Sequence, residues 1–421
     1  MSTLYPPAYE SSATPIVQGV PVQVANGVTD SPAANSSAEE AAGKLSNFPP
    51  GLVNAMVGSL RVFPVRFFVV DNSGSMQATD GNRLILDAQG RGRMVQATRW
   101  EELSDTVLQI GAMAHALRAR LDFHLLNPRP VLHGRGRLEP AGQFFTMVHD
   151  GHSTGAEAVS SCGQPLDVQG LRQVMGTSPG GTTPLTEAVM QLVSLIEPAA
   201  AELRASGQQA VVVLATDGMP NDPPSFLAAL QRLQLLPVWT VVRLCTDDDG
   251  VVRYWSELDA SLEAPLEVLD DDLGEAKEVH AMNPWLTYGA PLQLARTFGM
   301  HDKLFDLLDE AALIPSQLRQ FCELLLGVPL PEPDLDAAAF VAAVRAALPT
   351  GYRARVRPKP QPNSSPSPEP TQVKAALQTM PPVFDPLTSR LKPWIDVHVL
   401  TRQLERHKGV ATCLGPNCAI S

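Results

Sequence analysis

The sequence has 421 residues, of which 44% are hydrophobic, and a formal net charge of −12, which fits one large or two modest globular domains. The acidic balance argues against nucleic-acid binding, because there is no cationic excess to displace counterions from phosphates. No basic start followed by an apolar run marks a secretory signal, and no apolar stretch is long enough to span a membrane. The five cysteines form no paired C-x-x-C zinc pattern. We therefore expect a cytoplasmic protein in a reducing environment.

Residues 1–47 are rich in Ser, Ala, Pro and Val and show neither helical nor strand periodicity, so we expect this segment to be disordered. It contains Pro6, Pro7, Ala8 and Tyr9, which match the proline–tyrosine ligand of WW domains. A WW-domain protein is therefore one candidate partner, although a match of four residues also arises by chance.

From residue 61 the sequence alternates between strand and helix patterns. Residues 62–70 form a nearly continuous apolar run that ends in a polar loop, as in a central parallel strand. Residues 83–95 predict a hairpin that turns at its glycines and projects from the loop after this strand. Residues 100–119 carry apolar side chains at helical spacing.

The same alternation continues through the middle of the chain. Further strands are predicted over residues 121–126, 143–148, 210–215, 238–244 and 266–269, and helices over residues 184–205, 223–233 and 251–262. Interleaved strands and helices predict an α/β fold with a doubly wound, mostly parallel central sheet and helices on both faces.

The last part of the chain changes character. We expect the α/β domain to cover residues 61–280 and a helical extension to cover residues 281–348, packed on that domain or standing beside it. Residues 349–386 are predicted to be a proline-rich linker with neither helix nor sheet. Residues 387–421 are predicted to contain an amphipathic helix, over residues 393–407, and a tail that ends in Cys-Ala-Ile-Ser.

Oxygen-bearing side chains occur where three predicted elements meet their loops. Asp71, Ser73 and Ser75 form a D-x-S-x-S pattern directly after the first strand, Thr182 precedes a helix, and Asp217 follows a buried strand. Ligands of open parallel sheets bind beyond the carboxyl ends of the strands, so the topology brings these positions together. Taken singly, such residues usually cap helices or satisfy backbone donors. All three motifs in order favour a site for a hard cation.

These motifs resemble the metal-ion-dependent adhesion site of von Willebrand factor type A domains, in the family's order and over residues 61–279. By that resemblance Ser73, Ser75 and Thr182 contact the ion directly, and Asp71 and Asp217 act through bound water. The oxygen donors suit Mg²⁺, with Mn²⁺ or Ca²⁺ as alternatives.

The resemblance implies a function in binding and not in catalysis. Two carboxylates neutralise a dication, and an open coordination position then accepts an acidic residue of another protein. We therefore expect a metal-dependent adaptor or scaffold. The copines are cytosolic relatives of this kind, but the sequence has no counterpart of their C2 domains; ubiquitin-pathway proteins with a type A-like domain are another comparison, but no RING-type cysteine and histidine spacing is present.

Two other motifs suggest alternative functions. Residues 151–155, Gly-His-Ser-Thr-Gly, match the nucleophile elbow of serine hydrolases and make Ser153 a candidate nucleophile. The residues that follow are too short and polar a run for the buried helix of an elbow, so a surface turn is favoured. The acidic run at residues 270–272 is interpreted as the start of a helix rather than a metal site.

The extreme C-terminus matches a lipidation signal. Cys418 begins a C-a-a-X pattern whose final serine favours attachment of a farnesyl group. We favour lipidation over a chance match of four residues. One prenyl chain anchors a protein only marginally, so a second signal is needed, and Cys413 is a candidate for palmitoylation. The alternative is a frayed tail with spare thiols. Peripheral membrane contact is thus an expectation that depends on these two residues.

Overall fold

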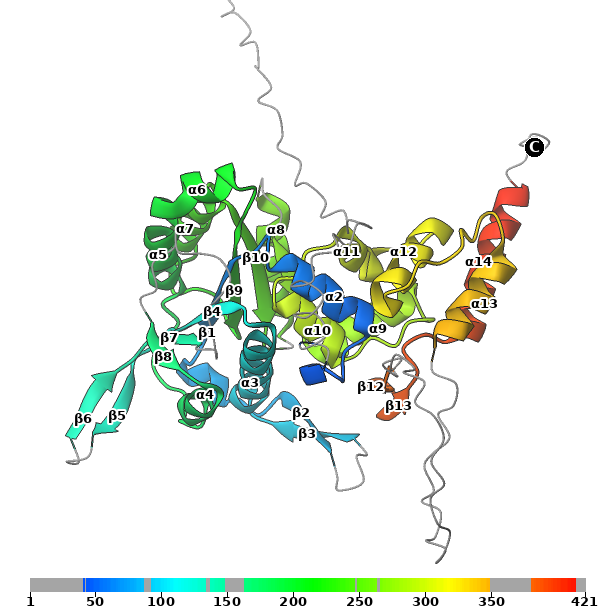
Figure 1. Cartoon of the computed structure of the whole chain (residues 1–421). Coiled ribbons are helices and arrows are strands. Elements are labelled where there is room, and N and C mark those ends of the chain that lie inside the picture. Colours follow the sequence, from blue (N-terminus) through cyan, green and yellow to red (C-terminus); the bar gives the residue numbers. More distant parts are fainter. Residues whose placement is uncertain are drawn as a thin grey trace, which may run out of the picture.

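The structure of the protein is a computed structural model, and a seven-stranded sheet forms its centre (Figure 1). The structure describes residue 41 and residues 43–86, 92–133, 137–147, 163–246, 248–262, 266–348 and 380–413. The strands of this sheet are β1 (Val65–Val70), β4 (Arg120–Leu125), β7 (Phe144–Met147), β8 (Gln164–Leu166), β9 (Ala210–Thr216), β10 (Val238–Leu244) and β11 (Glu267–Leu269).

The strand order is β11-β10-β9-β1-β4-β7-β8. All neighbouring strands from β11 to β4 pair in parallel, while β7 is antiparallel to β4. The chain moves outward from β1 to β8, then returns to the other side of β1 and continues from β9 to β11. The order therefore reverses between β1 and β9, which is where open α/β sheets bind ligands. The predicted doubly wound, mostly parallel sheet is confirmed.

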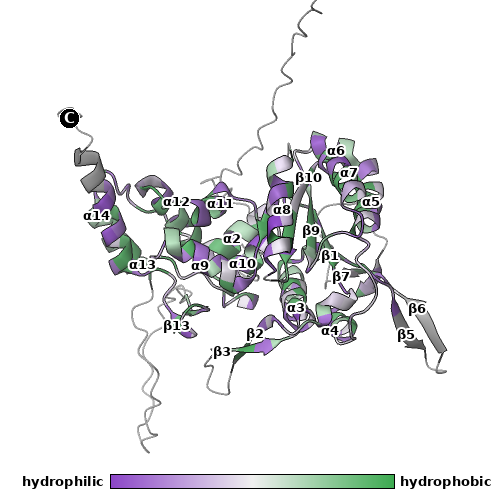
Figure 2. Cartoon of the chain, turned by 180° about the vertical axis from the view of Figure 1, so that it is seen from behind, coloured by the Kyte–Doolittle hydropathy of each residue, from purple (hydrophilic) through white to green (hydrophobic). Residues whose placement is uncertain are grey.

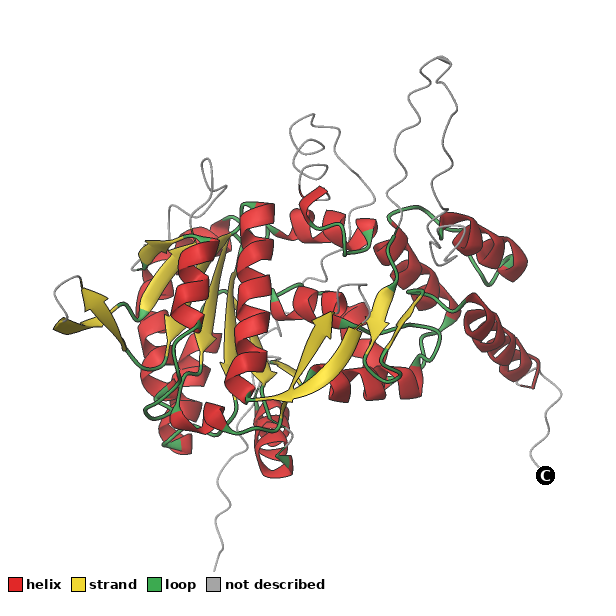
Figure 3. Cartoon of the chain, turned by 90° about the horizontal axis from the view of Figure 1, so that it is seen from below, coloured by secondary structure: helices red, strands yellow, loops and turns green. Residues whose placement is uncertain are grey.

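Helices cover both faces of this sheet, because alternate residues of β1 point into two different cores (Figures 2 and 3). Val65, Phe67 and Val69 belong to one core, and Phe68 and Val70 to the other. The first core contains α5 (Leu185–Ile196), the turn η2 (Glu197–Ala199), α6 (Ala200–Ala205), α7 (Pro223–Gln234) and α8 (Asp249–Ser261), and the second contains α3 (Arg99–Leu117) and α4 (Val168–Met175).

Two hairpins project from the carboxyl edge of the sheet (Figure 1). The predicted one follows the short helix η1 (Gly74–Gln77) and pairs β2 (Gly81–Leu86) with β3 (Gly92–Ala97). The second pairs β5 (Arg129–His133) with β6 (Arg137–Ala141) and was missed by the sequence analysis.

The helical extension packs on the face of the sheet that carries α3. Its helices are α9 (Asp272–Met282), α10 (Ala290–Thr297), α11 (Lys303–Glu310), α12 (Pro315–Leu326) and α13 (Ala337–Ala347), joined by α2 (Pro50–Ser59) from before the sheet. One hydrophobic cluster contains Phe68 of β1, Leu292 of α10 and Phe321 of α12. Arg66 of β1 donates to the carbonyl of Phe298 at 2.9 Å. Sheet and extension therefore share one core.

Two of the predicted unstructured segments contain ordered parts. Ala41 and Leu45, inside the segment predicted to be disordered, are buried in the shared core. Inside the predicted linker, β12 (Val383–Asp385) pairs with β13 (Arg390–Lys392). Both predictions are wrong over these residues, because apolar side chains scattered without periodicity still find a hydrophobic surface to cover. Residues 1–40 and 349–379 lie outside the described part of the chain.

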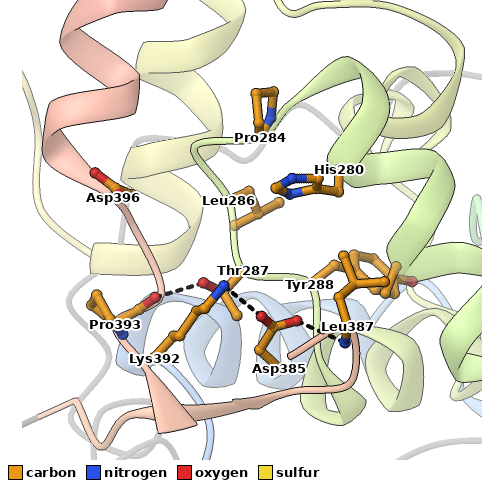
Figure 4. Close-up of a pocket in the computed structure, with 11 residues that line it drawn as sticks. His280, Pro284, Leu286, Thr287, Tyr288, Asp385, Leu387, Lys392, Pro393 and Asp396 are labelled. Atoms are coloured by element: carbon orange, nitrogen blue, oxygen red, sulfur yellow. Dashed lines mark hydrogen bonds and ion pairs between the residues drawn. The ribbon is translucent and has the colours of Figure 1, made fainter. Parts of the chain in front are cut away.

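The C-terminal segment is held against the extension. The predicted amphipathic helix is α14 (Val397–Cys413), and its Leu400 and Leu404 are buried in the shared core rather than exposed. A cavity of about 90 Å³ lies where this segment meets the chain after α9, with an ion pair of 2.6 Å between Lys392 and Asp385 in its wall (Figure 4). Among the described residues, no helix has the length and apolar character that crossing a bilayer requires.

Candidate metal centre

The loop after β1 begins with a buried carboxylate that ties the ends of β1 and β9 together. Asp71 Oδ1 accepts the backbone N–H of Ser73 at 2.9 Å, and its Oδ2 accepts the hydroxyl of Thr216 at 2.6 Å. The N–H of Asp71 itself donates to the carbonyl of Ala215 on β9. The fixed carboxylate lies at the point where the strand order reverses.

The two serines of this loop lead from Asp71 to the end of β9. The hydroxyl oxygens of Ser73 and Ser75 are 2.9 Å apart, and Ser75 Oγ donates to Asp217 Oδ1 at 2.9 Å. Ser73 and Asp217 are each only 2% exposed, whereas Ser75 is exposed. The structure thus brings these three oxygen donors into one contact chain that opens to solvent at Ser75.

Thr182 reaches the same place through its backbone. The carbonyl of Gly181 accepts the N–H of Gly74 at 3.1 Å, and the carbonyl of Thr182 accepts Asn127 Nδ2 at 2.8 Å. Gly181 has a φ of +106°, and a Cβ there would collide with the Asn127 side chain, so glycine is required. Thr182 itself is exposed and follows Gly181 directly in the sequence.

Arg99, the first residue of α3, was missed by the sequence analysis. Its guanidinium donates to Asp217 Oδ2 at 3.0 Å and makes two hydrogen bonds to Asp80 at 2.7 and 2.5 Å. The hydrogen bond to Asp80 raises the pKa of Arg99 above its usual range, so the guanidinium stays charged. The S/T-x-x-E capping box formed by Thr98 and Glu101 marks the start of this helix in the sequence, but not what Arg99 contacts.

The electrostatics of the site favour a cation. Burial raises the pKa of Asp71, and the negative charge of Asp217 adds to this, while hydrogen bonds from Thr216 and Ser73 oppose it. Two buried carboxylates so close together repel one another unless positive charge is supplied. Arg99 supplies one unit from one side, and the side with the hydroxyls remains open.

The donor set fits a hard divalent ion. Carboxylate and hydroxyl oxygens are the ligands that Mg²⁺ and Ca²⁺ prefer, whereas zinc sites in proteins usually include nitrogen or sulfur ligands. Cys245 follows β10 near this site, but burial raises the pKa of its thiol far above its usual range, so it stays protonated. The residues that the structure brings together and that can hold such an ion are Asp71, Ser73, Ser75 and Asp217; Thr182 adjoins them through the backbone of Gly181.

A second acidic cluster lies elsewhere, in the helical extension. One carboxylate oxygen from each of Glu275, Glu278 and Asp309 lies within 4.8 Å of the others. Arg296 already pairs with Glu275 at 2.5 Å, and burial raises the pKa of Glu275 to about 7. Positive charge is thus supplied from within the protein, which makes this cluster a weaker competitor for a metal ion.

Some of the remaining predicted site residues lie in the described part of the chain, and the others lie outside it. Asp271 caps α9 by accepting the N–H of Gly274, as expected for an acidic helix start. Cys413 is the last residue of α14. Ser153, Cys418 and the tetrapeptide at residues 6–9 lie outside the described residues, so the predictions made on them stay predictions.

Comparison with known proteins gives a limited result. No protein-family model and no curated protein matches the sequence. One solved structure similar to this chain is a manganese-loaded TRAP protein from Plasmodium vivax, at 12% sequence identity and a TM-score of 0.28, covering 50% of this chain and 69% of that one.

Proposed function

We propose that residues 61–280 form a von Willebrand factor type A-like domain with a metal-ion-dependent adhesion site. Ser73, Ser75 and Thr182 would bind Mg²⁺ directly, and Asp71 and Asp217 through water. The contact chain from Ser73 through Ser75 to Asp217, at the point where the strand order reverses, is the observation that carries this proposal.

The bound ion serves to recruit another protein. Because Asp71 and Asp217 are buried and Ser75 and Thr182 are exposed, a ligand reaches the ion from the solvent side. A carboxylate from a partner protein is the natural ligand for the remaining coordination position of a hard cation. The proposed role is therefore a cytoplasmic adaptor that grips an acidic partner, with no chemical step.

Mg²⁺ is the ion we propose, with Mn²⁺ and Ca²⁺ as alternatives. Small, closely spaced hydroxyl and carboxylate donors suit an octahedral ion that keeps some of its water, whereas Ca²⁺ usually takes more carboxylate oxygens. Farnesylation of Cys418 would add a weak membrane anchor to this adaptor, and a Cys418→Ser variant tests it by its distribution between membrane and soluble fractions.

Calorimetric titration of Mg²⁺ into the full chain tests the metal site. Asp71→Asn keeps an acceptor for the Ser73 N–H while removing one charge, and Ser75→Ala removes one exposed hydroxyl. We expect the first change to weaken Mg²⁺ binding at least tenfold and the second to weaken it less.

Glu278→Gln, in the second acidic cluster, is the matched control and should leave the affinity unchanged. Equal affinity for wild type and Asp71→Asn would contradict the proposal. A loss confined to Glu278→Gln would move the metal to the helical extension.

A further inference from the structure

A groove of about 490 Å³ runs beside the candidate metal centre. One face of α3 forms its floor, and β2 and α4, both neighbours of α3 in Figure 1, form its walls with the loop after α4. The indole of Trp100 donates to the carbonyl of Met175 at 3.1 Å and thereby fixes α4 against α3. The groove is thus part of the folded framework.

Ser104 and Arg172, two polar side chains of the groove, have no hydrogen-bond or ion-pair partner among the described residues. Ser104 is 9% exposed, and its hydroxyl has no hydrogen-bond partner. Arg172 of α4 is exposed and has no carboxylate partner among the described residues. A buried hydroxyl without a partner is uncommon in native proteins, and a ligand that binds it removes its desolvation cost.

The other charges of the groove are already paired. Arg83 donates to both oxygens of Asp105 at 2.6 and 2.8 Å. Glu101 accepts the N–H and the hydroxyl of Thr98 at the start of α3. Of the two arginines that line the groove, Arg172 is the one whose charge is left for a ligand.

The groove is continuous with the metal site. Pro179 lines the groove, and its carbonyl accepts Gln77 Nε2 of the metal-site loop at 3.0 Å. The next residues, Gly180 and Gly181, hydrogen-bond to Asn72 and Gly74 of the same loop. The groove and the proposed metal site are therefore neighbours, joined by the contacts between these two loops.

We infer that this groove binds the stretch of partner chain next to the metal-bound acidic residue, and that Arg172 and Ser104 recognise a second acidic side chain on it. The partner is thereby an extended segment with two acidic residues rather than one. This inference rests on the proposed function, because the first acidic residue must be held by the metal.

Synthetic fluorescent peptides with one aspartate, or with a second aspartate two to five residues away, test this inference by anisotropy in Mg²⁺ and in EDTA. At one spacing the second aspartate should tighten Mg²⁺-dependent binding about three- to tenfold, the range for a partly exposed ion pair with one added hydrogen bond. Arg172→Glu should abolish that gain and Ser104→Ala should reduce it.

Arg345→Glu is the matched control, since Arg345 is an exposed arginine on α13, at the opposite end of the molecule from α4 (Figure 1). The single-aspartate peptide should bind all variants equally, which shows that each one is folded. A second aspartate without effect at every spacing, or a gain that survives Arg172→Glu, would overturn the inference and leave the metal site standing. If no peptide binds in a Mg²⁺-dependent way, the proposed function itself fails.

Discussion

Two regions at the central sheet bury charged side chains but differ in how those side chains are paired. Near β11, Arg296 is 3% exposed and pairs with Glu267 at 2.8 Å and Glu275 at 2.5 Å, so its positive charge is buried in direct contact with two carboxylates. At the end of β1, Asp71 and Asp217 are buried just as deeply. Arg99 pairs with Asp217, but no cation among the described residues pairs with Asp71, and the neighbouring Ser75 is exposed.

The difference indicates what each region does. Arg296 contacts two buried carboxylates directly and thereby holds β11, α9 and α10 together. At the end of β1 the charge of Asp71 is offset by hydrogen bonds alone, so a proton or a cation from solvent is needed to neutralise it. The first arrangement is structural, and the second is the one expected of a binding site.

Removing Arg296 should have the largest effect. Arg296→Met leaves Glu267 and Glu275 buried without their shared ion-pair partner and should lower the free energy of unfolding by about 3–5 kcal/mol, measured by urea denaturation. Arg319→Met is the control, because its pairs with Glu323 and Glu332 are partly exposed and should be worth less than about 1 kcal/mol. Similar losses in the two variants would break the comparison.

His124 is a third case: it is a buried titratable side chain that belongs to no ion pair among the described residues and is not part of the candidate metal site. Neither ring nitrogen has a hydrogen-bond partner among the described residues, and burial lowers the pKa of His124 from 6.5 to about 4. The folded state then binds fewer protons than the unfolded state, so stability present above pH 6.5 is lost as the pH falls toward 4. The loss should reach about 3 kcal/mol.

A His124→Leu variant should flatten this dependence between pH 6.5 and 4 in denaturation curves measured at a series of pH values. The ring packs between Phe67 and Phe144, so leucine retains an apolar contact there. An unchanged pH profile would mean that His124 is not the group that titrates.

Metal binding should stabilise the region around Asp71 and Asp217 and leave the ion pairs of Arg296 unaffected. Mg²⁺ at a hundredfold excess over its Kd should add about 2.7 kcal/mol to the free energy of unfolding, and EDTA should remove it. Asp71→Asn should lose this increment, while Glu278→Gln should retain it. A Mg²⁺ increment that persists in Asp71→Asn would place the ion elsewhere.

The smallest effect is expected from Arg99, which already supplies part of the positive charge at the site. Arg99→Met removes a cation bound to Asp217 and should tighten Mg²⁺ binding by about 1 kcal/mol, or roughly fivefold. Arg232→Met, at an exposed pair with Glu197, should not change the affinity. Weaker Mg²⁺ binding in Arg99→Met would show that Arg99 positions Asp217 rather than competing with the ion.

Much of the α/β region followed from local patterns. The apolar run before Asp71 predicts a buried central strand, and β1 is buried along its whole length. The glycines near residue 91 predict the β2–β3 hairpin. By contrast, β5 and β6 lie in a polar stretch without clear alternation, and short hairpins of this kind leave little signal in one sequence.

The amino-acid sequence by itself determined most strands and helices of the α/β region, and that Asp71, Ser73, Ser75 and Asp217 leave the strands at one edge of the sheet, because periodicity and chain order are local properties. Only the tertiary structure decided that Arg99 meets Asp217, that Arg296 meets Glu267, and that Ser104 stays without a partner. These contacts join residues from different elements, and periodicity tells which face of an element is buried but not which element covers it.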